Sequence, residues 1–96
     1  MPGHGGCARI RKDVVFRDLD GELVLLNLRT GVYFGLDRVG TRIWGLIADE
    51  RSLSEIVGAL TAEYEVDAET CEADVAQFVA TLADNELIDL ADAPSR

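Results

Sequence analysis

Few residues of this 96-residue chain combine a type and a spacing that could do covalent or metal chemistry. Cys71 falls on an apolar stripe with helical spacing, where a cysteine usually acts as a small buried hydrophobe. Cys7 and His4, the single histidine, lie in a glycine-rich N-terminal segment that shows no periodic pattern. Zinc sites usually combine cysteine or histidine ligands a few residues apart, and the chain has no CxxC. We therefore expect no metal ion and no thiol nucleophile.

Paired carboxylates could serve as general acid and base, but each pair falls in a predicted turn. Asp18 and Asp20 lie between two apolar runs, and Asp49 and Glu50 follow another. Turn and capping roles explain these residues. The GHGG run at residues 3–6 precedes any strand and lacks the following helix that would present backbone amides to a phosphate. The sequence thus predicts a protein that is not an enzyme and needs no cofactor.

Two aromatic residues could stack on a ligand. Trp44 lies on a helical apolar stripe, which favours a place in the core. Tyr33 falls on the opposite side of its strand from Val32 and Phe34. It therefore either covers the outer face of the sheet or lines a binding groove.

Three short strands must position these residues. Val14–Arg17, Glu22–Asn27 and Val32–Leu36 are rich in branched and aromatic residues, and the turns at 18–21 and 28–31 end in glycine. Such short connections predict a three-stranded antiparallel meander. No later long strand is available to pair with the third strand, so its edge is either capped or meant for a partner.

The apolar period then changes from two to about 3.6 residues, which indicates helices. Asp37 can cap a first helix with the apolar stripe Val39, Ile43, Trp44 and Ile47. Ser52 and Glu55 form a capping box that opens a second helix. Asp67 can cap a third helix with the apolar face Cys71, Val75, Phe78 and Leu82.

Gly40, Asn85 and the segment after the third helix have further predicted roles in the fold. Gly40, one turn before Trp44, is expected to allow close approach of a strand. Asn85 can end the third helix in the left-handed conformation. Leu87–Leu90 then forms either a short closing strand or a docked extension. The predicted fold is α+β and winged-helix-like: a three-stranded antiparallel β-meander followed by three α-helices.

Charge is distributed unevenly along the chain, whose net charge is −9. Residues 46–96 hold thirteen acidic and two basic residues, whereas residues 1–17 are net basic. A nucleic-acid-binding protein usually presents a basic face to phosphate, so the acidic half favours basic partners or simple solubility instead. No apolar run approaches the roughly 20 residues that span a bilayer, and the N-terminus lacks the apolar part of a signal peptide. We therefore expect a cytoplasmic protein without a membrane partner.

One ordered set of parts spans residues 13–90, between a flexible tail at 1–12 and a short tail at 91–96. Its parts are the strand–turn–strand Leu25–Phe34, Leu36, Gly40, Trp44, the Ser52-Leu53-Ile56 helix start, Tyr64, Val66, the Val75–Leu82 stripe and Glu86-Leu87-Ile88. Their order and spacing resemble the PqqD family, the leader-recognition domains of ribosomally synthesised and modified peptides. The acidity and length of the chain are particularly similar to the small recognition subunits of lasso-peptide biosynthesis.

The resemblance implies a winged-helix-like domain that does no chemistry. It is expected to bind the leader of a precursor peptide as an extra strand beside Val32–Leu36 and against the third helix. It would then present that precursor to a leader peptidase or another modifying enzyme. The candidate peptide-binding residues are Val32, Tyr33, Phe34, Gly35, Leu36, Glu72, Val75, Ala76, Phe78 and Val79. Val79 is expected at a partly open margin, where replacement by glutamate leaves the fold intact.

Two hypotheses from other classes remain open. In a winged-helix DNA-binding regulator the third helix would read DNA, but its residues Glu69, Glu72 and Asp74 would repel phosphate. These carboxylates could instead meet a basic residue of the leader or of the enzyme and speed encounter. In a self-associating structural module, the open edge would pair with its own copy across a two-fold axis. We expect no nucleic-acid partner, and either a monomer or a weak homodimer.

Overall fold

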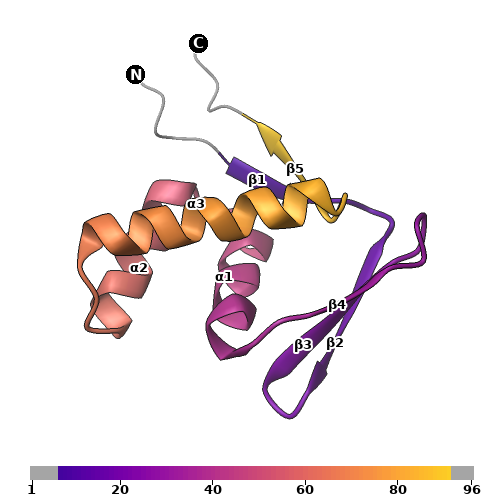
Figure 1. Cartoon of the computed structure of the whole chain (residues 1–96), viewed down its shortest axis with the longest axis horizontal. Coiled ribbons are helices and arrows are strands. Elements are labelled where there is room, and N and C mark those ends of the chain that lie inside the picture. The colour runs from indigo at the N-terminus through magenta and orange to yellow at the C-terminus, as the bar shows by residue number, and fades with distance from the viewer. Residues whose placement is uncertain (1–6, 92–96) are drawn as a thin grey trace.

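The three-stranded meander and the three helices that follow it are both present, so the predicted fold class is confirmed. The computed structural model describes residues 7–91 (Figure 1). Its elements are β1 (Cys7–Ile10), β2 (Val14–Leu19), β3 (Glu22–Asn27), β4 (Tyr33–Gly35), α1 (Arg38–Ala48), α2 (Leu53–Glu63), α3 (Ala68–Asp84) and β5 (Ile88–Ala91). The GHGG run, His4 and the C-terminal residues 92–96 lie outside the described part.

β3 is the centre of the antiparallel sheet β2-β3-β4. The β2–β3 turn places Asp20 and Gly21 at positive φ, and the side chain of Asp18 accepts a hydrogen bond from Gly21 N at 2.8 Å. The second turn places Gly31 at φ 77°. Glycine and aspartate tolerate this left-handed region best, which explains why the chain reverses at these two points.

Residues 7–10 form a strand, so the prediction of a flexible tail over residues 1–12 is wrong for its described part. β1 pairs antiparallel with β5, with Cys7 opposite Ala91 and Ile10 opposite Ile88. Ala8 is buried in the core. The sequence hides this strand because four residues are too few to show an alternation, and the partner strand lies at the other end of the chain. For Leu87–Leu90 the sequence allowed either a closing strand or a docked extension, and the structure shows a strand with the bounds Ile88–Ala91.

The predicted helix starts are confirmed. The carboxylate of Asp37 accepts from Gly40 N at 2.8 Å, and the carboxylate of Asp67 accepts from Thr70 N at 3.0 Å. Ser52 and Glu55 form both hydrogen bonds of a capping box. Each cap satisfies a backbone donor that the first turn of a helix leaves unpaired.

The end of α3 differs by one residue from the prediction. Asn85 keeps a negative φ of −93°, and Glu86 takes the left-handed conformation at φ 60°. The side-chain amide of Asn85 donates to Thr81 O at 2.8 Å, which holds Asn85 on the helix. Leu87 N then donates to Leu82 O, as in a Schellman motif with Glu86 in the position after the cap.

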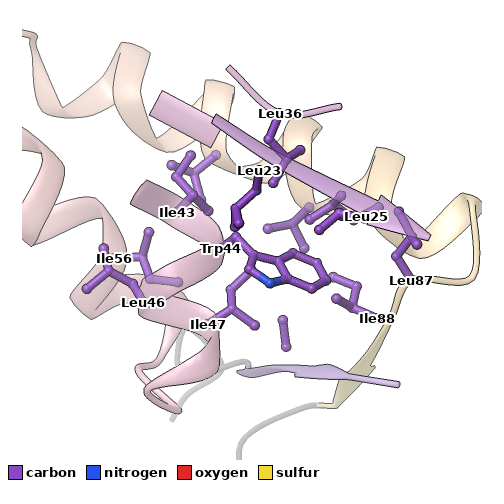
Figure 2. Close-up of a cluster of buried hydrophobic side chains, with 14 of the residues drawn as sticks. Leu23, Leu25, Leu36, Ile43, Trp44, Leu46, Ile47, Ile56, Leu87 and Ile88 are labelled. Carbon is purple, nitrogen blue, oxygen red and sulfur yellow. The ribbon is translucent and has the colours of Figure 1, made fainter. Parts of the chain in front are cut away.

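The core surrounds Trp44, which is 1% exposed. Its indole lies among Leu25 of β3, Ile47 of α1 and Ile88 of β5 (Figure 2). The ring of Phe16 meets it edge-on, with centroids 5.7 Å apart. The expectation that Trp44 is a core residue rather than a ligand-stacking one is confirmed.

The apolar stripe of α1 needs one correction. Val39 is 42% exposed, whereas Leu46 is buried together with the other predicted stripe residues. Val39 lies in the first turn of the helix, just after the chain leaves β4, whereas the buried apolar side chains of α1 begin at Ile43.

Candidate functional site

The residues with nucleophilic or metal-binding side chains are not brought together in the described part. Cys71 is buried in the core, where burial and then the charge of Asp74 raise the pKa of its thiol. Cys7 is half-buried in β1. Residues 7–91 contain no group of three His, Cys, Asp or Glu side chains that could hold a metal ion. No helix within this range is long and apolar enough to cross a membrane.

The edge of β4 is the clearest backbone feature of the sheet. Within residues 7–91, β4 is paired on one side only, in register with β3: Gly35 opposite Val24, Phe34 opposite Leu25 and Tyr33 opposite Leu26. The ladder continues beyond the strand through Asn27 N to Val32 O at 3.0 Å and Leu36 N to Leu23 O at 2.8 Å. Val32 and Leu36 therefore flank β4, rather than belonging to it as the sequence predicted.

These two flanking bonds reveal which backbone groups of β4 point away from the sheet. In an antiparallel ladder, hydrogen-bonded and non-hydrogen-bonded pairs alternate. Because Val32 and Leu36 bond to β3, Phe34 does so as well. Tyr33 and Gly35 lie in the intervening pairs, so their N–H and C=O groups face the side of β4 that no other described strand occupies.

The side chains of β4 alternate between the two faces of the sheet, as predicted. Phe34 is half-buried against the core and Leu36 is buried, whereas Val32 stays exposed. Tyr33, 69% exposed, lies on the outer face. This settles its position in favour of the outer face. A shallow hollow of about 360 Å³ lies there, lined by Val15, Phe16, Arg17, Leu19, Val24, Leu26 and Tyr33.

The predicted α3 residues fall into three groups. Val75 and Val79 are each 2% exposed, so the expectation that Val79 lies at an open margin is wrong. Val79 lies about 40° around the helix axis from Val75, and Ala83, beyond it on the same side, is also partly buried, so the buried face of α3 is wider than the predicted stripe. A glutamate at this position would bury an unpaired charge, so Val79→Glu is expected to unfold the protein.

Phe78 is half-buried and marks the flank of α3 that faces the start of α1. A Cβ on Gly40 would lie 3.2 Å from Cζ of Phe78. We expected this glycine to allow the close approach of a strand, but the element that approaches it is α3. Asp74 and Thr81, four residues before and three after Phe78, share its flank. Both are exposed. We call this flank, together with the outward backbone groups of Tyr33 and Gly35, the β4–α3 border.

Glu72 and Ala76 lie on the opposite flank of α3 from Phe78. Successive helical residues turn by 100°, which separates Ala76 from Phe78 by more than a third of a turn across the buried stripe. Both Glu72 and Ala76 are exposed. The structure therefore does not bring these two residues to the β4–α3 border.

Asn27 was missed by the sequence reasoning. It stands at the end of β3 and is 1% exposed, and no other polar residue in the described range is buried. Its Oδ1 accepts from the backbone of the β3–β4 turn, and its Nδ2 donates to the turn that follows α3. One signal was present in the sequence: Asn27 continues the inward-facing alternation of Leu23 and Leu25 with a polar residue.

The chain matches one protein family and two solved structures. Residues 22–88 match the family described as "Coenzyme PQQ synthesis protein D (PqqD)". The structure described as "TbiB1 in Complex with the TbiA(beta) Leader Peptide" is 48% identical with a TM-score of 0.82, covering 84% of this chain and 94% of that one. "Lasso peptide synthetase B1 complexed with the leader peptide" is 30% identical with a TM-score of 0.80, covering 85% of this chain and 96% of that one. No curated protein matches.

The class of protein follows from these findings: an α+β domain with an exposed edge strand beside a helix, like two solved leader-peptide complexes. The chain belongs to the PqqD family.

Proposed function

We propose that this protein is a non-catalytic adaptor of lasso-peptide biosynthesis that binds the leader of a precursor peptide by strand addition. Two structural relatives that are 48% and 30% identical are described as leader-peptide complexes. Both matches extend over most of this chain and nearly all of the relative, so the whole domain supports the inference. We further propose that the adaptor works in the cytoplasm, where ribosomal precursors are made.

The observation that carries this function is the outward-facing backbone of Tyr33 and Gly35. Their N–H and C=O groups offer donors and acceptors at the spacing that a neighbouring antiparallel strand requires. Main-chain bonds of this kind fix the register of a peptide but do not depend on its side chains. The side chains are read by what lies beside the edge.

The flank of α3 around Phe78 supplies that neighbouring surface. In a strand added to β4, alternate side chains point to opposite faces of the sheet. One set would point towards the core face, on which Phe34 lies, and towards Phe78 of α3. The other set would point to the outer face beside Tyr33. The leader therefore meets apolar residues on both sides of its own backbone.

The charge of α3 favours a basic segment in the partner. Glu69, Glu72 and Asp74 are exposed and distributed around the first half of the helix. They suit the positive end of the helix dipole and also attract cationic peptide. The same carboxylates disfavour binding to DNA, since the helix that would enter the groove is acidic. We propose that the bound leader is presented to a leader peptidase or another modifying enzyme.

A fluorescence-anisotropy titration tests the proposal, with the labelled TbiA(beta) leader as probe and a scrambled peptide of the same composition as control. We expect saturable binding of the leader alone. Amide hydrogen exchange in the complex should slow at Tyr33 and Gly35, whereas Phe34 should change little because its N–H already bonds to β3. Equal binding of the two peptides would contradict the proposal. Light scattering in the absence of peptide shows whether the edge pairs two copies instead.

A further inference from the structure

The side chain of Asn27 is buried with all of its hydrogen-bonding capacity in use. Its Oδ1 accepts from Arg29 N at 2.9 Å and from Thr30 N at 3.2 Å. Its Nδ2 donates to Glu86 O at 2.8 Å and to Asn85 O at 3.3 Å. A buried amide destabilises the fold unless its polar atoms are paired, so this complete pairing indicates a specific structural task.

Stabilising the β3–β4 turn would require only half of this side chain. An acceptor alone can hold the N–H groups of Arg29 and Thr30, as aspartate and serine do in many turns. The donor half of Asn27 instead reaches carbonyl groups that lie almost 60 residues further along the chain. Only an amide combines both functions at this length. The task of Asn27 is therefore to join two turns to each other.

The two turns that Asn27 joins are the one before β4 and the one after α3. An exposed ion pair between Arg29 and Glu86 repeats the connection at the surface. At the other end of β4, α1 begins, and there Phe78 of α3 packs against Gly40. β4 is thus connected to α3 at both of its ends, and Tyr33 and Gly35 belong to the strand between these two connections.

We propose that Asn27 is a positioning residue for leader binding. It keeps the edge of β4 at a distance from α3 that leaves room for one added strand. Asn27 is buried and touches no part of the leader. It acts by fixing the β3–β4 turn, so that the leader does not have to order this turn when it binds. The inference rests on the proposed function and adds to it the element that sets the geometry of the site.

Asn27→Asp tests the inference, because it keeps the acceptor for the turn and replaces the donor with an oxygen that faces two carbonyl groups. The matched control is Ile56→Val or Ile56→Ala in α2, chosen to give the same loss in melting temperature. Ile56 is fully buried and belongs to α2, which lies on the far side of α1 from β4 (Figure 1). Affinity for the labelled TbiA(beta) leader is measured well below both melting temperatures. We expect Asn27→Asp to weaken binding about tenfold, mainly through faster dissociation, and the control to stay within about twofold.

Equal affinities of Asn27→Asp and its stability-matched control would overturn the positioning role and leave the proposed function in place. Failure of the unaltered protein to bind the leader would instead remove the proposed function itself. If Asn27→Asp does not fold, Arg29→Gln and Glu86→Gln break the same connection at the surface. These two variants should each weaken binding about threefold, and normal binding by both would overturn the inference.

Discussion

The ring of Phe78 in α3 covers the backbone of Gly40 in the first turn of α1. A Cβ built on Gly40 would lie 3.2 Å from Cζ and 3.3 Å from Cε1 of that ring. Few real contacts of a Cβ are as short as this, so the ring can keep its position only above a glycine. The contact joins α3 to the point where β4 passes into α1, and so fixes one end of the β4–α3 border.

This contact predicts a coupling between the two residues. Alanine is favoured over glycine inside a helix by about 1 kcal/mol, but in the native protein its methyl would press on the ring. Gly40→Ala should therefore destabilise the native protein and stabilise the Phe78→Leu variant, with a coupling energy of about 1 kcal/mol. Denaturant unfolding of the four proteins measures it. The new methyl also approaches Asp37, but equally in both backgrounds. Identical effects of Gly40→Ala in the two backgrounds would show that the ring does not restrict this position.

The alternation along β4 predicts opposite outcomes for proline at adjacent positions. Tyr33→Pro removes an N–H that faces outward, so the protein should fold and bind leader about fivefold to tenfold more weakly. Phe34→Pro removes an N–H that bonds to β3, so it should lower the melting temperature. Tyr33→Ala, which keeps the backbone donor, is the control for the lost ring. Normal leader affinity in a folded Tyr33→Pro protein would exclude strand addition at this edge.

The two flanks of α3 should respond differently to an added charge. Thr81 shares the flank of Phe78, whereas Ala76 lies across the buried stripe, and both are exposed. Thr81→Glu should weaken leader binding about fivefold or more, because it places a carboxylate beside an apolar edge. Ala76→Glu adds the same charge to the same helix and should leave the affinity within about twofold. Melting temperatures show that both variants fold. A stronger effect of Ala76→Glu would move the site to the other flank.

Acid should weaken the start of α3 through its cap. The pKa of Asp67 is held below its ordinary value by hydrogen bonds from the Thr70 hydroxyl and then from the Thr70 N–H. A lowered pKa in the folded state contributes stability above the unfolded value, about 3.9, and this contribution is lost as the pH falls through the folded value. Asp67→Asn keeps a capping oxygen without the titration. Its melting temperature should fall less than that of the native protein between about pH 5 and pH 2. Parallel curves would show that this cap does not titrate with folding.

The salt dependence of binding distinguishes whether the acidic residues of α3 attract the leader or serve only the helix start and solubility. If Glu69, Glu72 or Asp74 attracts the leader, raising the ionic strength from about 50 to 500 mM should slow association several-fold and change dissociation less. Stopped-flow binding measures both rates. An association rate that does not depend on salt would leave these carboxylates as helix-start and solubility residues.

The sequence was sufficient where a feature depends on neighbours in the chain. The caps at Asp37, Ser52 and Asp67 were predicted correctly because a cap bonds to an amide three residues away. The helical stripe was also predicted, but spacing alone placed Val79 at its margin, and only the packing of α3 shows that this margin is buried. An apolar stripe in the sequence therefore predicts which side of a helix is buried better than it predicts how wide the buried face is.

Features that depend on distant segments could not be read in this way. The strand Cys7–Ile10 is defined by its pairing with Ile88–Ala91, and neither segment predicts the other. The role of Asn27 likewise comes from carbonyl groups at the far end of α3. Local sequence patterns were enough to predict the fold class. The geometry of the candidate site depends instead on long-range hydrogen bonds of Asn27, which no sequence motif predicts.

The pairing of β1 with β5 brings the two ends of the described chain side by side. Cys7 lies opposite Ala91, so the chain enters and leaves the domain at one place, on the other side of α3 from β4 (Figure 1). A short linker could join these two ends, and new ends could be opened at the exposed Asp49–Glu50 turn between α1 and α2. Such a circular permutant would keep β3, β4 and α3 in their native order. A fused enzyme or a surface tether at either end would likewise leave unobstructed the edge of β4, where we propose that the leader binds.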